Sequence, residues 1–197
     1  MKIKLLLPFM IIAISLFSCQ SKEKQEESKS SELDKAVYLE RGQKIAGATF
    51  TALSSKLQAA MQEGGVVHAI EYCNLAAYPL VDSLSKVHQA TIRRTSTKVR
   101  NEKDTPTTAE LAVLEEYQKM AEEGEALKPI VKELNQEYMA FYAPIRINAS
   151  CLQCHGKVGE TLLEENHALI KELYPNDKAI GYSDGDFRGI WSIKLKK

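Results

Sequence analysis

An α+β fold is predicted from two contrasting parts of the sequence. In the first part, apolar residues recur at helical spacing over long stretches. The later part contains short runs rich in β-branched and aromatic residues, bounded by turn-forming residues and interrupted by helical stretches. No internal repeat is visible. These features predict long helices first, followed by an antiparallel sheet that helices interrupt.

The two long helices are predicted to meet at a pair of glycines. Apolar residues keep helical spacing over residues 33–62, and Gly64-Gly65 ends that stretch. A second helical stretch covers about 66–87, in which Pro79 is expected to break or kink the helix. The later elements are a strand at 90–97, a helix from Thr107 or Thr108 with Glu110 to about Glu123, a hairpin over 129–147 that turns at 134–136, a helix at about 159–173 and a closing strand from Phe187 to Leu195.

The N-terminus has the pattern of a secretory leader. Lys2 and Lys4 precede an apolar stretch, Leu5 to Phe17, which is too short for a comfortable membrane span. It ends in Leu16-Phe17-Ser18-Cys19, which resembles a bacterial lipobox, with cleavage before an acylated cysteine; the alternative is an ordinary secretory signal with an incidental cysteine. We therefore expect a signal peptide over 1–18, a lipidated flexible tether over 19–33 and one domain over 34–197. The expected location is the periplasmic side of a membrane, and Gln20 after the cysteine favours the outer membrane.

Composition excludes one class of partner. The chain has 26 Lys and Arg against 26 Asp and Glu, so its formal net charge is zero. Nucleic-acid binding depends on a surplus of basic residues that neutralises phosphates. We therefore expect no nucleic-acid partner. No apolar run after the leader approaches membrane length.

The motif that carries chemistry is Cys151-Leu152-Gln153-Cys154-His155. The pattern C-x-x-C-H is the attachment signature of c-type haem. Two thiols three residues apart reach the two vinyl groups on one porphyrin edge, and the adjacent histidine then lies under the iron. The alternatives are a thioredoxin-like redox pair, which needs a βαβ setting, a zinc site, which needs a second ligand pair, and a small structural disulfide.

Counting thiols leaves Cys73 without a partner in an oxidising compartment. It is either a buried, inert residue or a thiolate ligand to the iron, opposite His155. Other side chains could also supply the sixth ligand, although helical methionines are more often core residues and surface histidines are usually solvated. These candidates are Met61, Met120, Met139, His68, His88 and His167.

Four sequence blocks, in this order, resemble one family. They read HAIEYCNLAA at 68–77, RRTSTKVRN at 93–101, PIRINASCLQCHG at 144–156 and YPNDKAIGYSDGDFRG at 174–189. Together they are similar to the bacterial PAS-like c-type haem family, long catalogued as a domain of unknown function. Its members are stand-alone haem proteins and sensor ectodomains. The resemblance spans roughly residues 35–195.

The resemblance implies a PAS-like antiparallel sheet flanked by helices, with one haem c held at its side. Cys73 matches the family's axial thiolate, and the C-x-x-C-H block matches Cys151, Cys154 and His155. Four arginines fall in matching blocks, where haem propionates or salt bridges to Asp184 or Asp186 are their alternative partners. They are Arg93, Arg94, Arg100 and Arg188.

These expectations favour a lipid-anchored monohaem cytochrome that senses redox state or a gas, or carries electrons, through a protein partner. A thiolate opposite an imidazole stabilises ferric iron and leaves no open position for substrate. We therefore do not expect an enzyme. A haem peroxidase and a haem-free structural lipoprotein are the alternatives, and the long first helix could pair two copies of the chain.

Overall fold

The computed structural model describes the backbone of residues 20–197 and the side chains from Glu32 onward. The leader and Cys19 lie outside the described residues. The chain divides into Met1–Ala36 and a compact unit, Val37–Lys197, to which all the packing below belongs. Within the described residues, no helix has the length and apolar character to cross a membrane.

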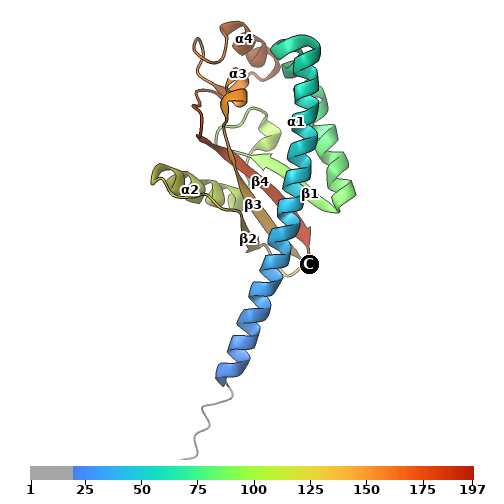
Figure 1. Ribbon diagram of the computed structural model, residues 1–197, viewed down its shortest axis with the longest axis vertical. Coiled ribbons are helices and arrows are strands. Elements are labelled where there is room, and N and C mark those ends of the chain that lie inside the picture. The colour runs from blue at the N-terminus through green and yellow to red at the C-terminus, as the bar shows by residue number, and fades with distance from the viewer. Residues whose placement is uncertain (1–19) are drawn as a thin grey trace, which may run out of the picture. The chain divides into compact units, whose positions relative to one another are not determined.

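The longest element, α1, covers Gln20–His88 and bends at the predicted pair of glycines. Its backbone leaves helical geometry only at Gly64 (φ −152°, ψ 20°) and Gly65 (φ 72°, ψ −163°), and Gly65 has the positive φ that favours glycine. Figure 1 shows the helix turning back on itself there. The predicted break is therefore confirmed at the glycines and wrong at Pro79. Pro79 is exposed, so water can donate a hydrogen bond to the carbonyl that has lost its helical partner.

The helix begins earlier than the sequence predicts. It starts at Gln20 and so includes residues 20–33, where a flexible tether is expected. The polar composition of this segment favours a tether. The segment is also rich in Glu, Lys and Gln, which are strong helix formers, and local propensity accounts for the earlier start.

A four-stranded antiparallel sheet forms the centre of the compact unit. Its strands are β1 (Ala90–Thr95), β2 (Ile130–Glu133), β3 (Tyr138–Arg146) and β4 (Phe187–Lys196). The order across the sheet is β1-β4-β3-β2, so the last strand in sequence pairs with both β1 and β3. The predicted strands and the β2–β3 hairpin are confirmed.

Helices cover both faces of this sheet. On one face, α1 packs Ile45, Ala46 and Val81 against the largest buried side chains of the strands, which include Phe141 and Ile193. On the other face, α2 (Thr108–Glu122) packs its own apolar residues against alternate positions of β3 and β4. Figure 1 shows the two helices on either side of the strands. The α+β fold with a helix-flanked antiparallel sheet is confirmed.

The remaining helices are short. They are α3 (Leu152–His155), α4 (Glu164–Leu173) and the 3-10 turns η1 (Glu102–Asp104) and η2 (Ala149–Cys151). The prediction that α4 starts near residue 159 is wrong. Gly159 has φ 78°, and the backbone forms a bridge between Val158 and Leu162 before the helix begins. The side chain of Leu162 is completely buried. Burial of that leucine fixes a loop where the apolar pattern alone suggests helix.

The start of α2 provides a prediction. Thr107 accepts a hydrogen bond from the Glu110 backbone at 3.3 Å, and Glu110 accepts one from the Thr107 backbone at 2.8 Å, which is a complete capping box. Thr107→Ala is expected to lower the free energy of unfolding by about 1 kcal/mol, since one helix N–H loses its partner. Urea denaturation measures this. Thr108→Ala, inside the first turn, is the control, and equal losses in both variants would contradict the assignment.

Candidate functional site

The predicted motif lies on two short consecutive helical turns. Cys151 ends η2, and Cys154 and His155 lie on α3, so the two thiols are one helical turn apart on the same side. The Asn148 side chain caps η2 by accepting a hydrogen bond from the Ser150 backbone at 3.0 Å. Cys73, Cys151 and Cys154 are all free thiols, so the alternative of a structural disulfide is wrong among the described cysteines.

His155 is held as a neutral imidazole with one nitrogen left over. Its Nδ1 lies 2.7 Å from the carbonyl oxygen of Ala179, to which it donates when that nitrogen carries the proton. Burial lowers the pKa of His155 well below the usual range, and the positive charges of Arg100 and Arg188 lower it further. The neutral ring therefore presents an unshared electron pair at Nε2, which is the form in which histidine binds a metal.

Arg100 ties the motif to the loop that positions His155. One guanidinium nitrogen donates to the carbonyl of Cys154 at 2.6 Å and also lies 3.2 Å from Asp177. The Asp177 carboxylate is fully buried and accepts a second bond from the backbone N–H of Ala179 at 2.8 Å. The same ion pair thus fixes both the chain beneath Cys154 and the residue whose carbonyl orients the imidazole.

The structure brings Cys73 to the same site. Ile70, one turn before it on α1, and Val66, two turns before it, pack in one apolar cluster with Cys154, Leu162 and Ile170. Residues three apart share a helix face, so Cys73 lies on the side of α1 that contacts the motif. Figure 1 shows α3 and α4 gathered beside the bend of α1.

Charges at the site act on both thiols. Burial raises the pKa of Cys73, while the positive charges of Arg94 and Arg100 lower it. Burial raises the pKa of Cys154, which Arg100 lowers and the Cys73 thiol raises again. Burial is the larger effect, so the pKa of Cys73 is raised overall, and the two arginines offset that rise only in part.

The other sixth-ligand candidates do not take part in these interactions. Met120 packs with the α2 cluster and Met139 is buried in β3, while the ring of His68 lies 3.5 Å from the Glu63 carboxylate. None of the six contributes to the hydrogen bonds or charge effects at His155 and Cys73 described above. Of the candidates, the site brings together Cys73, Cys151, Cys154 and His155.

The expected arginine partners need correction. Arg100 pairs with Asp177, and Arg93 lies 3.3 Å from Glu110 of α2. Arg94 lies over the Trp191 ring, and Arg188 donates to the carbonyl of Lys98. The alternative of salt bridges to Asp184 or Asp186 is therefore wrong. Both acids are exposed, and the Asp186 carboxylate is already used within its own turn, where it accepts from the Ser183 backbone.

Sequence reasoning missed three groups at this site: Asp177, the Ala179 carbonyl and Tyr182. The Tyr182 ring meets the His155 ring edge-on, with centroids 6.4 Å apart, and Arg188 lies over its face. A backbone carbonyl has no signature in the sequence. Asp177 and Tyr182 stand in the block at 174–189, so that block marked the segment, but nothing in the sequence pairs Asp177 with Arg100, which lies 77 residues away.

These residues fit the group that the motif predicts. Two free thiols one turn apart and a neutral imidazole with a free Nε2 are the donors that a covalently attached haem requires. A zinc site lacks comparable support, because the described residues contain no cluster of three or more His, Cys, Asp or Glu placed to hold a metal ion.

Comparison with known proteins gives a consistent result. The Tll0287-like family model matches residues 20–196. Among solved structures, the crystal structure of the cyanobacterial heme-protein Tll0287 is similar, with a TM-score of 0.52 and 19% identity over 76% of this chain and 94% of that one. At that identity the likeness supports the fold. No curated protein matches the chain. Since the family model covers nearly the whole described sequence, and the resemblance read from the four sequence blocks is confirmed, the chain belongs to the Tll0287-like family.

Proposed function

We propose that this chain is a monohaem c-type cytochrome that acts as a redox-sensing, gas-sensing or electron-transfer module. The observation that carries the proposal is His155, a neutral imidazole whose Nδ1 is fixed on Ala179 beside two free thiols. The similar solved structure is described as a heme-protein, which supports the same cofactor here.

Each residue has a distinct role in this proposal. The thiols of Cys151 and Cys154 would hold the haem covalently, each by addition across one vinyl group, which forms an S–C bond and a C–H bond and consumes no oxidant. His155 would bind the iron through Nε2, and Cys73 would bind it as a thiolate. The bound haem supplies one-electron redox chemistry.

The protonation state of Cys73 matters for how the site works. Burial raises the pKa of Cys73 and Arg94 and Arg100 lower it only in part, so the thiolate would depend on binding to the iron. An anionic ligand in turn favours ferric iron, so the reduction potential is expected to be low. With two protein ligands, no position is open for peroxide, which disfavours an enzyme. Protonation and release of Cys73 after reduction would open a position for NO or CO, and this distinguishes a gas sensor from an electron carrier.

We also propose that the protein is anchored by lipid at Cys19 on the periplasmic side of a membrane, with the outer membrane favoured. This rests on the lipobox-like sequence and on the need to attach haem outside the cytoplasm. Several acyl chains on one cysteine give stable attachment, whereas a single chain does not.

The test is spectroscopy of the full chain made with the cytochrome c maturation machinery. We expect covalent haem and a low-spin ferric EPR signal of thiolate type, and we expect Cys73→Ala to abolish that signal but keep the haem. Leu75→Ala, at an exposed position two residues away, is the control. An unchanged signal in Cys73→Ala would mean that Cys73 is an inert, buried residue and not an iron ligand. A colourless wild-type protein would contradict haem binding and favour the haem-free structural lipoprotein.

A second measurement separates sensor, carrier and enzyme. A gas sensor is expected to bind CO when reduced, with a shift of the Soret band. A ferrous protein that stays six-coordinate and ignores CO would contradict gas sensing and leave electron transfer. Turnover of peroxide with a dye substrate would instead favour the peroxidase alternative.

A further inference from the structure

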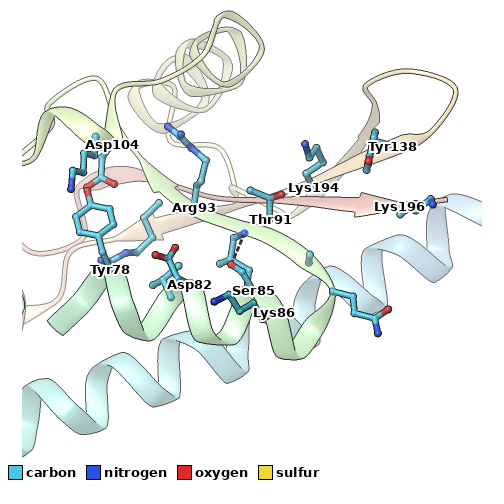
Figure 2. A pocket seen from close by; sticks show the side chains of 16 residues that line it. Tyr78, Asp82, Ser85, Lys86, Thr91, Arg93, Asp104, Tyr138, Lys194 and Lys196 are labelled. Atoms are coloured by element: carbon cyan, nitrogen blue, oxygen red, sulfur yellow. Dashed lines mark hydrogen bonds between the residues drawn. The ribbon is translucent and has the colours of Figure 1, made fainter.

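A groove of about 740 Å³ lies along the outer edge of β1, away from the haem motif. The α1 segment from Tyr78 to Lys86, together with Gln89 after the helix, forms one wall. The far end is lined by Tyr138, Lys194 and Lys196. Figure 2 shows these side chains arranged around β1, with Tyr78 and Asp104 at the opposite end. Neither His155 nor any cysteine lines it. Its volume is typical of pockets that bind small molecules.

The groove concentrates positive charge in a chain whose formal net charge is zero. Only Asp82 and Asp104 carry acidic groups in its lining. The basic side chains outnumber them threefold: Lys86, Arg93, Arg94, Lys103, Lys194 and Lys196. A concave surface lined by one sign of charge focuses the field and attracts ions of the opposite sign.

Several of these cations are available to a ligand. Within the described part of the chain, Lys86, Lys194 and Lys196 form no ion pair. Lys194 lies over the Tyr138 ring, with its ammonium 4.7 Å from the ring centroid. Arg93, in contrast, is already paired with Glu110. Lys103, whose ammonium lies 5.3 Å from the Tyr78 ring centroid, and Arg94 likewise have no ion pair among the described residues. Cations without carboxylate partners therefore line both ends of the groove.

The walls favour a compact molecule over an added peptide strand. The backbone N–H of Ile92, which faces out from the edge of β1, donates to the Ser85 hydroxyl of α1 at 3.2 Å (Figure 2). A strand pairing with this edge would need that N–H for itself. Val81 and Ile92 add buried apolar surface at the floor of the groove. The site thus combines cations with a little apolar contact, as binding sites for organic acids do.

We propose that this groove binds a small organic anion carrying two or more carboxylate or phosphate groups. Lys194, Lys196 and Lys86 provide the charges that hold it. Arg94 also lines the groove and adds to its positive charge.

The test is calorimetric titration of the haem-loaded full chain with citrate at low ionic strength, with acetate as the monovalent comparison. We expect citrate to bind and acetate to bind much more weakly. The double variant Lys194→Gln/Lys196→Gln is expected to weaken citrate affinity about tenfold, and added salt to weaken it in the wild type. Lys128→Gln/Lys178→Gln removes two exposed lysines outside the groove and is expected to leave the affinity unchanged.

Two results would overturn the proposal. Equal citrate affinity in both double variants would mean nonspecific attraction, and heat released by an acidic peptide but not by citrate would make the groove a protein-docking surface. Calorimetry needs no haem signal, so the test of anion binding can fail or succeed independently of the proposed cytochrome function.

Discussion

Asp177→Asn is expected to lower the free energy of unfolding by about 3 kcal/mol, the largest loss we predict for a single polar substitution. The carboxylate is fully buried and shares its two oxygens between Arg100 and the Ala179 backbone. Without it, a largely buried guanidinium keeps its charge but loses the anion that compensates it. The same substitution releases the Ala179 segment, whose carbonyl orients His155.

Urea denaturation measures the loss in free energy of unfolding. A surface ion pair provides the control for removing one negative charge. Glu116→Gln removes the carboxylate of a half-exposed ion pair with Lys132 at 2.8 Å and is expected to cost less than about 1 kcal/mol. In the haem-loaded protein, Asp177→Asn is also expected to alter the axial-ligand spectrum, whereas Glu116→Gln is not. Similar losses in both variants would mean that the Arg100–Asp177 pair has no special role.

Two glycines on α1 are expected to respond in opposite directions to the same substitution. A Cβ added at Gly42 would lie 2.1 Å from Cγ of Phe141, the fully buried aromatic residue at the centre of the α1–sheet core. Helix and sheet must separate to accommodate it, so Gly42→Ala is expected to destabilise the protein by about 3 kcal/mol. A Cβ at Gly47 would meet nothing within 4 Å, and Gly47→Ala is expected to stabilise the helix by about 0.5–1 kcal/mol.

The pair is compared by urea denaturation of the same chain, which cancels any general effect of alanine in a helix. The difference between the two variants, about 4 kcal/mol, is the quantity that reports the close approach of α1 to β3. Two stabilised variants would show that Phe141 can move aside, and that the packing of α1 on the sheet is looser than the structure indicates.

The elements of the fold were largely predictable because their signals are local. The capping box at Thr107 and the glycine bend in α1 depend only on neighbouring residues, and both are confirmed. The errors arose where distant packing decides the local structure. Leu162 is drawn into the cluster beneath α3, which delays the start of α4, and the exposed position of Pro79 lets the helix continue.

In the candidate site, too, residues with a local sequence signal were predictable and residues placed by distant packing were not. The C-x-x-C-H motif identifies three of its residues by spacing alone, and Cys73 was a candidate because it was an unpaired thiol. The Ala179 carbonyl and the Asp177 partner of Arg100 could not be predicted from spacing, since they lie more than twenty residues from the groups that they position. Every residue has a backbone carbonyl, so the role of the Ala179 carbonyl depends on the fold and cannot be read from the residue type.

The position of β4 between β1 and β3 has a consequence for the order of folding. Ala90 finds its partner Leu195 only when residues 187–196 have been made, so β1 has no strand to pair with until then. Closing so long a loop is slow, whereas the β2–β3 hairpin needs only a local turn. The Cys151–His155 segment is therefore synthesised while the sheet is incomplete. Its thiols therefore remain in an open chain until the last strand joins β1 and β3 and completes the packing around the motif.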